Sequence, residues 1–323
     1  MIMKTRQYFL YMILMSCLFT SCNAQNDDNG KPGVKQNTES IIQEIVQKDT
    51  IAFESNYMGE EPPGLIPKLF APGIISSPNN YEFKITFTPD GKEIYFTRGT
   101  GSGKTERLIM FTKLTGSGWT KPAAVSFSKI YMDEYPSISP DAKKMFFQSN
   151  RPLPDSWNRK TASHIFNLWC VERNGDGWGE PYPINAEANK GYCINYIDNN
   201  GSIYYNNSSF SKIVRASFTN GKFSEPLELN TPVKSTECYF ALDYSYVIFS
   251  SGSSSYGKLD LYVSFLENDC SWNTPINLGK NINTSESESA PVISPDGKYL
   301  FYNSHGEIYW VSVNIIEELR SKE

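Results

Sequence analysis

The pattern of hydrophobic and polar residues changes along the chain at about Pro62. Residues 23–60 are mostly polar. Beyond Pro62, short runs of β-branched and aromatic residues alternate with clusters of Gly, Pro, Asn, Asp and Ser. Strand-length runs separated by turn-forming residues are typical of an all-β domain. The pattern therefore predicts a fold of short strands joined by tight turns.

A repeat of two such runs around one turn occurs five times. Pro presets the backbone angle of such a turn, Asp and Asn bond to the local backbone, and Gly often follows. We expect five β-hairpins, at 86–98, 137–150, 196–208, 240–251 and 292–304. Their turn residues lie 43 to 59 residues apart, which is the size of a propeller blade. These turn residues are Asp90, Asp141, Asn200, Asp243 and Asp296.

A second repeat alternates with the first and adds an outer strand to each unit. It consists of an aromatic residue, two spacers and a proline, and it occurs at 119–122, 178–181, 223–226 and 272–275. Between the two repeats lies a further strand-forming run, seen at 167–171, 260–264 and 307–313. Each unit is therefore predicted to hold four strands. The proline is expected in the fourth, because an outer edge strand loses little when an N–H is missing.

The two repeats occur in unequal numbers, and the difference predicts how the ring closes. The fifth unit, 290–313, has no aromatic-x-x-Pro segment after it. Upstream of the first hairpin, Leu69-Phe-Ala-Pro72 matches the missing segment, with Leu69 in the aromatic position. A strand from the start of the domain would remove the open blade edge. We predict a single five-bladed β-propeller whose last blade is closed by this N-terminal strand. A six-bladed ring, with a degenerate blade in residues 40–80, is the alternative.

The turn sequence Ser-Pro-Asp-Gly-Lys at 294–298, followed by an aromatic-rich strand, resembles the WD-like Pro-Asp repeat. This repeat is found in the TolB-type propeller of the Tol-system translocation protein and in many exported bacterial lipoproteins. The resemblance covers about residues 65–313, and blades 3 and 4 depart from it at their turns. It implies a β-propeller fold and says little about function.

The N-terminal segment has the features of a bacterial export signal. Lys4 and Arg6 precede an apolar run at 8–19, which is shorter than the roughly 20 residues of a membrane span. The residues Phe19-Thr-Ser-Cys22 resemble the lipoprotein box, which implies lipidation of Cys22; ordinary cleavage nearby is the alternative. We expect a signal peptide at 1–21, a flexible tether at 22–61 and the propeller at 62–323. The chain is thus expected to be an exported outer-membrane lipoprotein, with exposure at the cell surface as a further option.

Charge and motifs argue against several partners. The formal net charge of −5 disfavours nucleic acid and anionic membrane surfaces, so membrane contact is expected through the lipid anchor only. Residues 99–105 resemble a phosphate-binding loop, but Arg98 occupies a required glycine position and a strand follows, so no nucleotide is expected. The cysteines left after processing match no metal spacing. They are expected to be buried, with disulfides as an open option, and they are Cys170, Cys193, Cys238 and Cys270.

Several carboxylates lie at or near the start of the first strand of a hairpin. Propeller loops at this position surround one mouth of the central channel, so we expect an acidic mouth. Its candidate ligand-binding residues are Glu82, Asp133, Glu134, Glu237 and Glu288. Such a group could hold Ca²⁺ or a sugar, and two carboxylates at a suitable separation could serve a glycosidase as acid and base. A polar loop without a ligand is the simpler alternative. No metal or other cofactor is expected apart from the calcium option.

The longest insertion lies in blade 2, at 151–166. It carries Trp157, Arg159 and His164, and loops in this position emerge on the same face as the acidic mouth. An exposed Trp beside polar groups suits stacking on a sugar or gripping a protein partner. A Trp that only pins the loop is the alternative.

Two hypotheses for the function follow. The preferred one is a non-enzymatic binding or scaffold lipoprotein of the cell envelope, which takes a protein or glycan ligand at the mouth. The second is a carbohydrate-active enzyme, a glycoside hydrolase or polysaccharide lyase, that uses the mouth carboxylates. The sequence names no catalytic residue, because it holds two histidines and no Gly-x-Ser-x-Gly segment.

Overall fold

The computed structural model describes residues 57–100, 106–154, 166–184, 192–198, 200–206, 212–219, 222–229, 237–241, 243–252, 256–269 and 271–321, with the backbone alone for 192–195. The chain divides into two compact units. The larger runs from Phe53 to Phe265 and from Trp272 to Glu323, and it holds the strands described below. The smaller comprises 1–52 and 266–271. In its described part, the backbone N–H of Ser271 donates to Asp269 Oδ1 at 2.9 Å.

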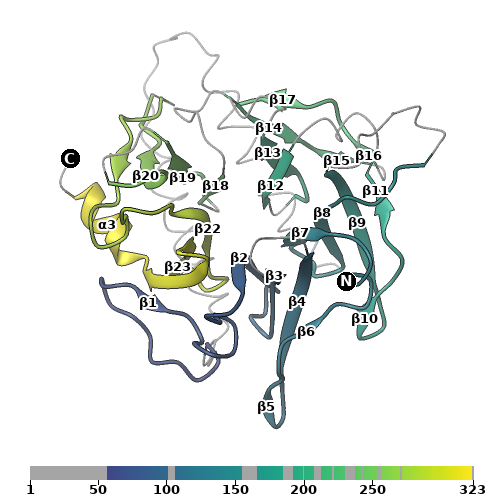
Figure 1. Ribbon diagram of the computed structural model, residues 1–323. Helices are drawn as coiled ribbons and strands as arrows, with labels where there is room; N and C mark the ends of the chain where they lie inside the picture. Colours follow the sequence, from purple (N-terminus) through teal and green to yellow (C-terminus); the bar gives the residue numbers. More distant parts are fainter. Residues whose placement is uncertain are drawn as a thin grey trace, which may run out of the picture. The chain divides into compact units, whose positions relative to one another are not determined.

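The larger unit is a five-bladed β-propeller of antiparallel sheets, as the repeats predict (Figure 1). Blade 1 contains β2 (Tyr81–Phe87), β3 (Glu93–Thr100), β4 (Glu106–Thr115) and β6 (Ala123–Ala124). Blade 2 contains β7 (Asp133–Ile138), β8 (Lys144–Ser149), β9 (Asn167–Asn174) and β11 (Tyr182–Pro183). Blade 3 contains β12 (Tyr192–Ile197), β13 (Ile203–Asn206), β14 (Ile213–Ala216) and β17 (Leu227–Glu228).

Blade 4 contains β18 (Cys238–Phe240), β19 (Tyr246–Ser251), β20 (Asp260–Phe265) and β21 (Ile276–Asn277). Blade 5 contains β22 (Ser289–Ile293), β23 (Tyr299–Ser304), β24 (Glu307–Ser312) and β1 (Lys68–Leu69). The first strands of the blades surround the centre of the propeller in Figure 1. Each of these inner strands contacts the inner strand of the next blade, and β22 contacts β2, so the ring is closed.

All five hairpin turns share one backbone conformation. The residue after each turn Asp or Asn has a φ between 56° and 75°, and these residues are Gly91, Ala142, Gly201, Tyr244 and Gly297. Glycine adopts this left-handed region without strain, whereas Ala and Tyr pay a steric cost. The Asp side chain supports the turn by accepting the backbone N–H two residues later, as Asp90 does from Lys92 at 3.1 Å. The departures from Pro-Asp-Gly in blades 3 and 4 therefore leave this feature of the turn unchanged.

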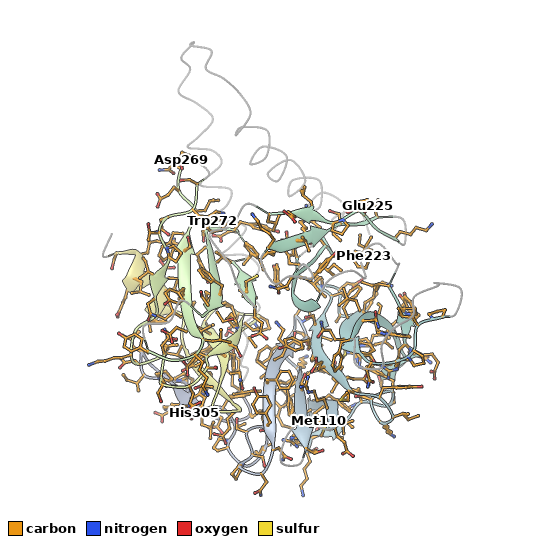
Figure 2. All side chains as sticks on the ribbon, turned by 45° about the horizontal axis from the view of Figure 1, so that its top comes forward. Met110, Phe223, Glu225, Asp269, Trp272 and His305 are labelled. Carbon is orange, nitrogen blue, oxygen red and sulfur yellow. The ribbon has the colours of Figure 1, made fainter. Side chains whose placement is uncertain are left out.

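The aromatic-x-x-Pro repeat was predicted within the outer strand. In the structure it lies at a hairpin tip, before that strand. Its aromatic residue sits at the tip in β5 (Gly118–Trp119), β10 (Gly177–Trp178) and β16 (Lys222–Phe223), the last paired with β15 (Phe218–Thr219). Phe223 and Trp272, labelled in Figure 2, belong to two of these repeats. The proline directly precedes the two-residue outer strand in all four blades that carry the repeat. Its missing N–H is therefore placed outside the ladder.

The last blade is closed from the N-terminal side, as the unequal counts predict. β1 pairs antiparallel with β24, with Lys68 opposite Trp310 and Leu69 opposite Tyr309. The N–H of Phe70 adds a hydrogen bond of 2.8 Å to the carbonyl of Ile308. The register differs from the expectation, because the strand follows Pro67 and not Pro72. Pro67 thus takes the place that the proline has before the outer strands of the other blades.

The hydrophobic core lies between neighbouring blades. One cluster joins blades 5 and 1 at the closure, and its fully buried members include Phe70, Phe96, Phe301 and Trp310. Three further clusters join blades 1 with 2, 2 with 3, and 3 with 4 and 5. Burial of apolar surface across these boundaries stabilises the ring.

The packed domain begins earlier than residue 62. Tyr57, in the stretch expected to be tether, is buried at the closure and donates from its hydroxyl to Asp296 Oδ1 at 2.6 Å. After β24 the chain forms the short helix α3 (Asn314–Arg320), which buries Ile315 and Ile316. Among the described residues, no helix has the length and apolar character needed to cross a membrane.

Candidate functional site

Three of the predicted mouth carboxylates occupy equivalent positions, each eight residues before the turn Asp of its blade. Glu82, Asp133 and Glu288 are fully buried. Glu82 accepts from Arg98 at 2.7 Å and from the N–H of Ser77 at 3.2 Å. A carboxylate in this position therefore ties the loop before the inner strand to the end of the next strand.

Asp133 is paired with an arginine that is itself buried. It forms a two-pronged ion pair with Arg151, at 2.5 and 3.0 Å. The Arg151 guanidinium lies 5.3 Å from the ring centre of Phe147 and 5.8 Å from that of Trp169, and it donates to the Phe127 carbonyl at 2.6 Å. A charge buried in this way is tolerated only because it is paired and hydrogen-bonded.

Glu288 has uncharged partners instead of an arginine. Its carboxylate accepts from the backbone N–H of Thr284 at 3.0 Å and from the Thr284 hydroxyl at 2.7 Å. The Ser304 hydroxyl also lies 2.7 Å from Glu288 Oε1. Ser304 in turn lies 2.8 Å from Nδ1 of His305, which occupies the exposed turn between β23 and β24.

Glu134 and Glu237 lie closer to the axis of the propeller. Glu134 forms an ion pair with Arg107, whose guanidinium lies 6.0 Å from the ring centre of Phe83. Glu237, at the start of blade 4, accepts from the hydroxyl of Tyr135 in blade 2 and from the N–H of Ala290 in blade 5, the latter at 2.6 Å. Glu237 therefore joins three blades across the centre.

The position that Glu237 occupies has an unusual backbone conformation in three other blades. Lys84, Tyr135, Glu237 and Ala290 each lie six residues before the turn Asp of their blade. Lys84, Tyr135 and Ala290 have φ values of 51°, 57° and 52°, at points where the pairing of the inner strand is interrupted. Non-glycine residues with positive φ are uncommon and cluster at functional sites. Tyr135, at one of these interruptions, donates from its hydroxyl to Glu237 across the axis.

Burial dominates the protonation chemistry of these acids. Loss of water raises the pKa of Glu82, Asp133 and Glu134 above the ordinary values, and the neighbouring arginines oppose this rise. Burial likewise raises the pKa of the Tyr81 phenol. The direction follows from the cost of placing a charge in a low-dielectric site.

A pocket of about 630 Å³ opens beside these residues. This volume falls in the range of about 300–1,000 Å³ that is common for small-molecule sites. We call it the mouth pocket, and residues of blades 1, 2, 4 and 5 line it, among them Tyr81, Tyr135, Glu237, Asn303 and His305. Of the five predicted carboxylates, Glu237 alone is among the residues that line this pocket.

Tyr81 is held in place by the turn of blade 5. Its ring lies so close to Gly306 that a Cβ at this position would approach the Tyr81 Cδ2 to 2.5 Å. Gly306 also has a φ of 78°, so a side chain there would be strained as well as obstructed. The ring of Phe83 lies 5.3 Å from that of Tyr81. Tyr81 is 37% exposed and presents its remaining surface to the pocket.

The structure describes only some of the remaining predicted residues, which are the lipidation site, the blade 2 insertion and the cysteines. Cys22, Trp157, Arg159 and His164 lie outside the described residues. Cys170 and Cys238 are buried, as predicted for these two positions. Cys270 and the side chain of Cys193 are not described.

Two chemical expectations bear on the described part of the chain. Within it, no three His, Cys, Asp or Glu side chains gather as ligands for a metal ion, so the calcium option gains no support from the mouth carboxylates. Around the phosphate-loop-like segment, β3 ends at Thr100 and β4 begins at Glu106, so a strand follows the segment as expected.

Sequence reasoning missed Tyr81, Tyr135, Asn303 and His305. A signal for Tyr135 exists, because aligning the blades on their turn residues places it in register with Glu237. Tyr81 directly precedes a predicted residue. Asn303 and His305 lie at the far end of the fifth hairpin, where nothing local distinguishes them from other turn residues.

The fold and its turns define this chain as a five-bladed β-propeller with Pro-Asp-type hairpins, a closure strand from the N-terminal side and a pocket at one mouth. Comparison with protein-family models and with curated proteins finds no match. The solved structures of similar fold include TolB-type propellers.

One of these is a protein described as a TolB from Agrobacterium tumefaciens, with 14% identity over 69% of this chain and 69% of that chain and a TM-score of 0.44. Another is TolB from Acinetobacter baumannii, with 13% identity over 72% and 54% and a TM-score of 0.43. A third is the periplasmic gluconolactonase of Pseudomonas aeruginosa, with 12% identity over 68% and 64% and a TM-score of 0.41. The chain spans about half the length of the Acinetobacter protein. At these identities the likeness concerns the fold alone.

Proposed function

We propose that the chain is an exported lipoprotein of the cell envelope, anchored through Cys22, whose propeller is a non-enzymatic binding module. Its ligand, a protein or a glycan, occupies the mouth pocket. One observation carries the proposal: a pocket lined by aromatic and polar groups lies beside carboxylates, most of which form ion pairs within the fold.

The use of the carboxylates favours binding over catalysis. Glu82, Asp133 and Glu134 are paired with Arg98, Arg151 and Arg107. A buried acid that bonds to an arginine stabilises the fold, and it is poorly placed to exchange protons with a substrate. The carbohydrate-active enzyme remains the second hypothesis, and this arrangement does not favour it.

Binding at the mouth pocket is tested with the full mature chain as bait for envelope extracts. Tyr81→Ala opens one wall of the pocket, and Tyr182→Ala is the matched control, because Tyr182 is 41% exposed on the outer strand β11. Capture of a component by the wild type and by Tyr182→Ala, with loss in Tyr81→Ala, supports the proposal. Equal capture by all three proteins removes the mouth pocket as the site. Wild-type turnover of a polysaccharide would overturn the non-enzymatic assignment.

The anchor is tested separately. Replacing Cys22 by Ser should abolish incorporation of labelled palmitate and release the protein from the membrane fraction, because the thiol is the expected acceptor of the lipid. Unchanged labelling of the Cys22→Ser variant would show that the lipid is attached elsewhere.

A further inference from the structure

A chain of hydrogen bonds leads from the buried Glu288 to the exposed His305. Glu288 Oε1 lies 2.7 Å from the Ser304 hydroxyl, and Ser304 Oγ lies 2.8 Å from His305 Nδ1. Glu288 is fully buried, Ser304 is nearly so, and His305 reaches the mouth pocket. His305, labelled in Figure 2, has a φ of 55° in the turn between β23 and β24.

The direction of each bond in this chain follows from the chemistry of the groups. A carboxylate only accepts, so the Ser304 hydroxyl donates its single proton to Glu288. The Thr284 hydroxyl donates to Glu288 for the same reason, and it accepts the N–H of Glu286 at 3.1 Å. Ser304 has no second proton for His305, so Nδ1 must be the donor and carries the hydrogen. The neutral imidazole then has an unprotonated Nε2, which can only accept.

The other groups of the mouth pocket suit a polyhydroxylated ligand. Tyr81 offers an aromatic surface held by Gly306, and Asn303 places its amide beside the Tyr81 hydroxyl at 3.5 Å. Among the described residues that line the pocket, Leu259 is the one aliphatic side chain, and most of the others carry a hydroxyl, amide, imidazole or carboxylate group.

We propose that His305 is held as the Nδ1–H tautomer, and that the ligand of the mouth pocket is a carbohydrate that donates a hydroxyl to His305 Nε2 and stacks on Tyr81. The inference rests on the proposed binding function and names its ligand class. Ser304 acts as a positioning residue, because it reaches the ligand only through His305. Glu288 sets the direction of both hydrogen bonds, because it accepts the Ser304 proton and leaves Ser304 to accept from His305 Nδ1.

The tautomer is tested without any ligand. Long-range ¹H–¹⁵N spectra of the full mature chain, labelled at histidine, contain two imidazoles, and His164→Gln assigns them. We expect a protonated Nδ1 and an unprotonated Nε2 for His305 at a pH where the ring is neutral. Ser304→Ala should release this preference and leave a mixture of tautomers. A dominant Nε2–H form in the wild type would overturn the proposal.

The ligand class is tested with a printed array of neutral and acidic oligosaccharides, and affinities for the spots that bind are measured by calorimetry. Tyr81→Ala and Ser304→Ala should each weaken binding by about tenfold, the change that about 1.4 kcal/mol produces. Tyr182→Ala should bind like the wild type. Melting temperatures of all variants show that each is folded before its affinity is compared.

The outcomes separate this inference from the proposed function. Glycan binding that is sensitive to Tyr81 and Ser304 supports both. An empty array, together with protein capture that Tyr81→Ala abolishes, overturns the carbohydrate assignment and leaves the binding function standing. Glycan binding that neither variant changes removes the mouth pocket as the carbohydrate site.

Discussion

The closure of the ring can be tested by a covalent bridge between β1 and β24. Leu69 and Tyr309 face each other in this pairing, and the adjacent hydrogen bond from Phe70 to Ile308 makes them a non-hydrogen-bonded pair. The Cα atoms of such pairs lie about 4.5 Å apart, which is within the reach of a disulfide. The double variant Leu69→Cys/Tyr309→Cys should therefore oxidise to a bridge without moving the backbone.

The expected gain follows from the length of chain that the bridge encloses. For a loop of about 240 residues, the chain-entropy relation gives about 5.5 kcal/mol, and disulfide bridges typically give about 2–4 kcal/mol. For a domain of about 250 residues, a gain of about 2–4 kcal/mol raises the melting temperature by roughly 5–15 °C. The large size of the effect reflects the fact that the two strands are neighbours in space and distant in sequence.

The assay compares oxidised and reduced samples of the same variant by calorimetry, with the bridge mapped by mass spectrometry. The reduced sample is the internal control, since it carries the same substitutions. A protein that folds but leaves both new thiols free would refute the pairing of β1 with β24. A bridge that forms without raising the melting temperature would contradict the stabilisation expected from constraining the unfolded chain.

Three further predictions concern stability and thiol reactivity. Asp133→Ala leaves Arg151 as an unpaired buried charge, so it should lower the free energy of unfolding by about 3–5 kcal/mol in a urea titration. The control Glu225→Ala, at an exposed position, should change it by less than about 0.5 kcal/mol. Equal losses in the two variants would refute the role of the ion pair. Burial raises the pKa of Cys238 from 9.0 to about 12, so this thiol should resist iodoacetamide at pH 8 until the protein unfolds. Its contribution to the free energy of unfolding should decline as the pH rises from 9 toward 12. Rapid labelling of Cys238 in the folded protein would contradict its burial. Ala142 has a φ of 56°, so Ala142→Gly should stabilise the protein by about 0.5–1 kcal/mol, and a lower melting temperature would count against the strain.

The candidate site could be predicted from the sequence only in part. Glu237, one of the carboxylates expected at the mouth, lines the mouth pocket. Glu82 and Glu134 were predicted as ligand-binding residues, but they are buried against Arg98 and Arg107, which belong to the neighbouring strands. Nothing in the chain sequence around these acids distinguishes a carboxylate that binds a ligand from one that holds a loop, because the difference depends on which side chain lies across the sheet.

The sequence by itself determined the hairpins, the number of blades and the source of the closing strand. These features depend on bonds between residues that are close in sequence, such as the side chain of Asp90 with the N–H of Lys92, and on counting repeats that such bonds produce. The sequence did not determine the register of the closing strand, because Pro67 and Pro72 both resemble the proline that precedes the outer strand in the other blades. In the structure the strand follows Pro67, and this register packs Phe70 against Phe301 and Trp310.

The tertiary structure alone decided the mouth pocket. Tyr81, Glu237 and His305 come from blades 1, 4 and 5, and they meet because the ring closes and brings its first and last strands together. Local sequence patterns indicate which residues form a strand, but they do not indicate which residues from different blades face each other across the axis. The contact between Tyr135 and Glu237 across the centre, 102 residues apart, is of this kind.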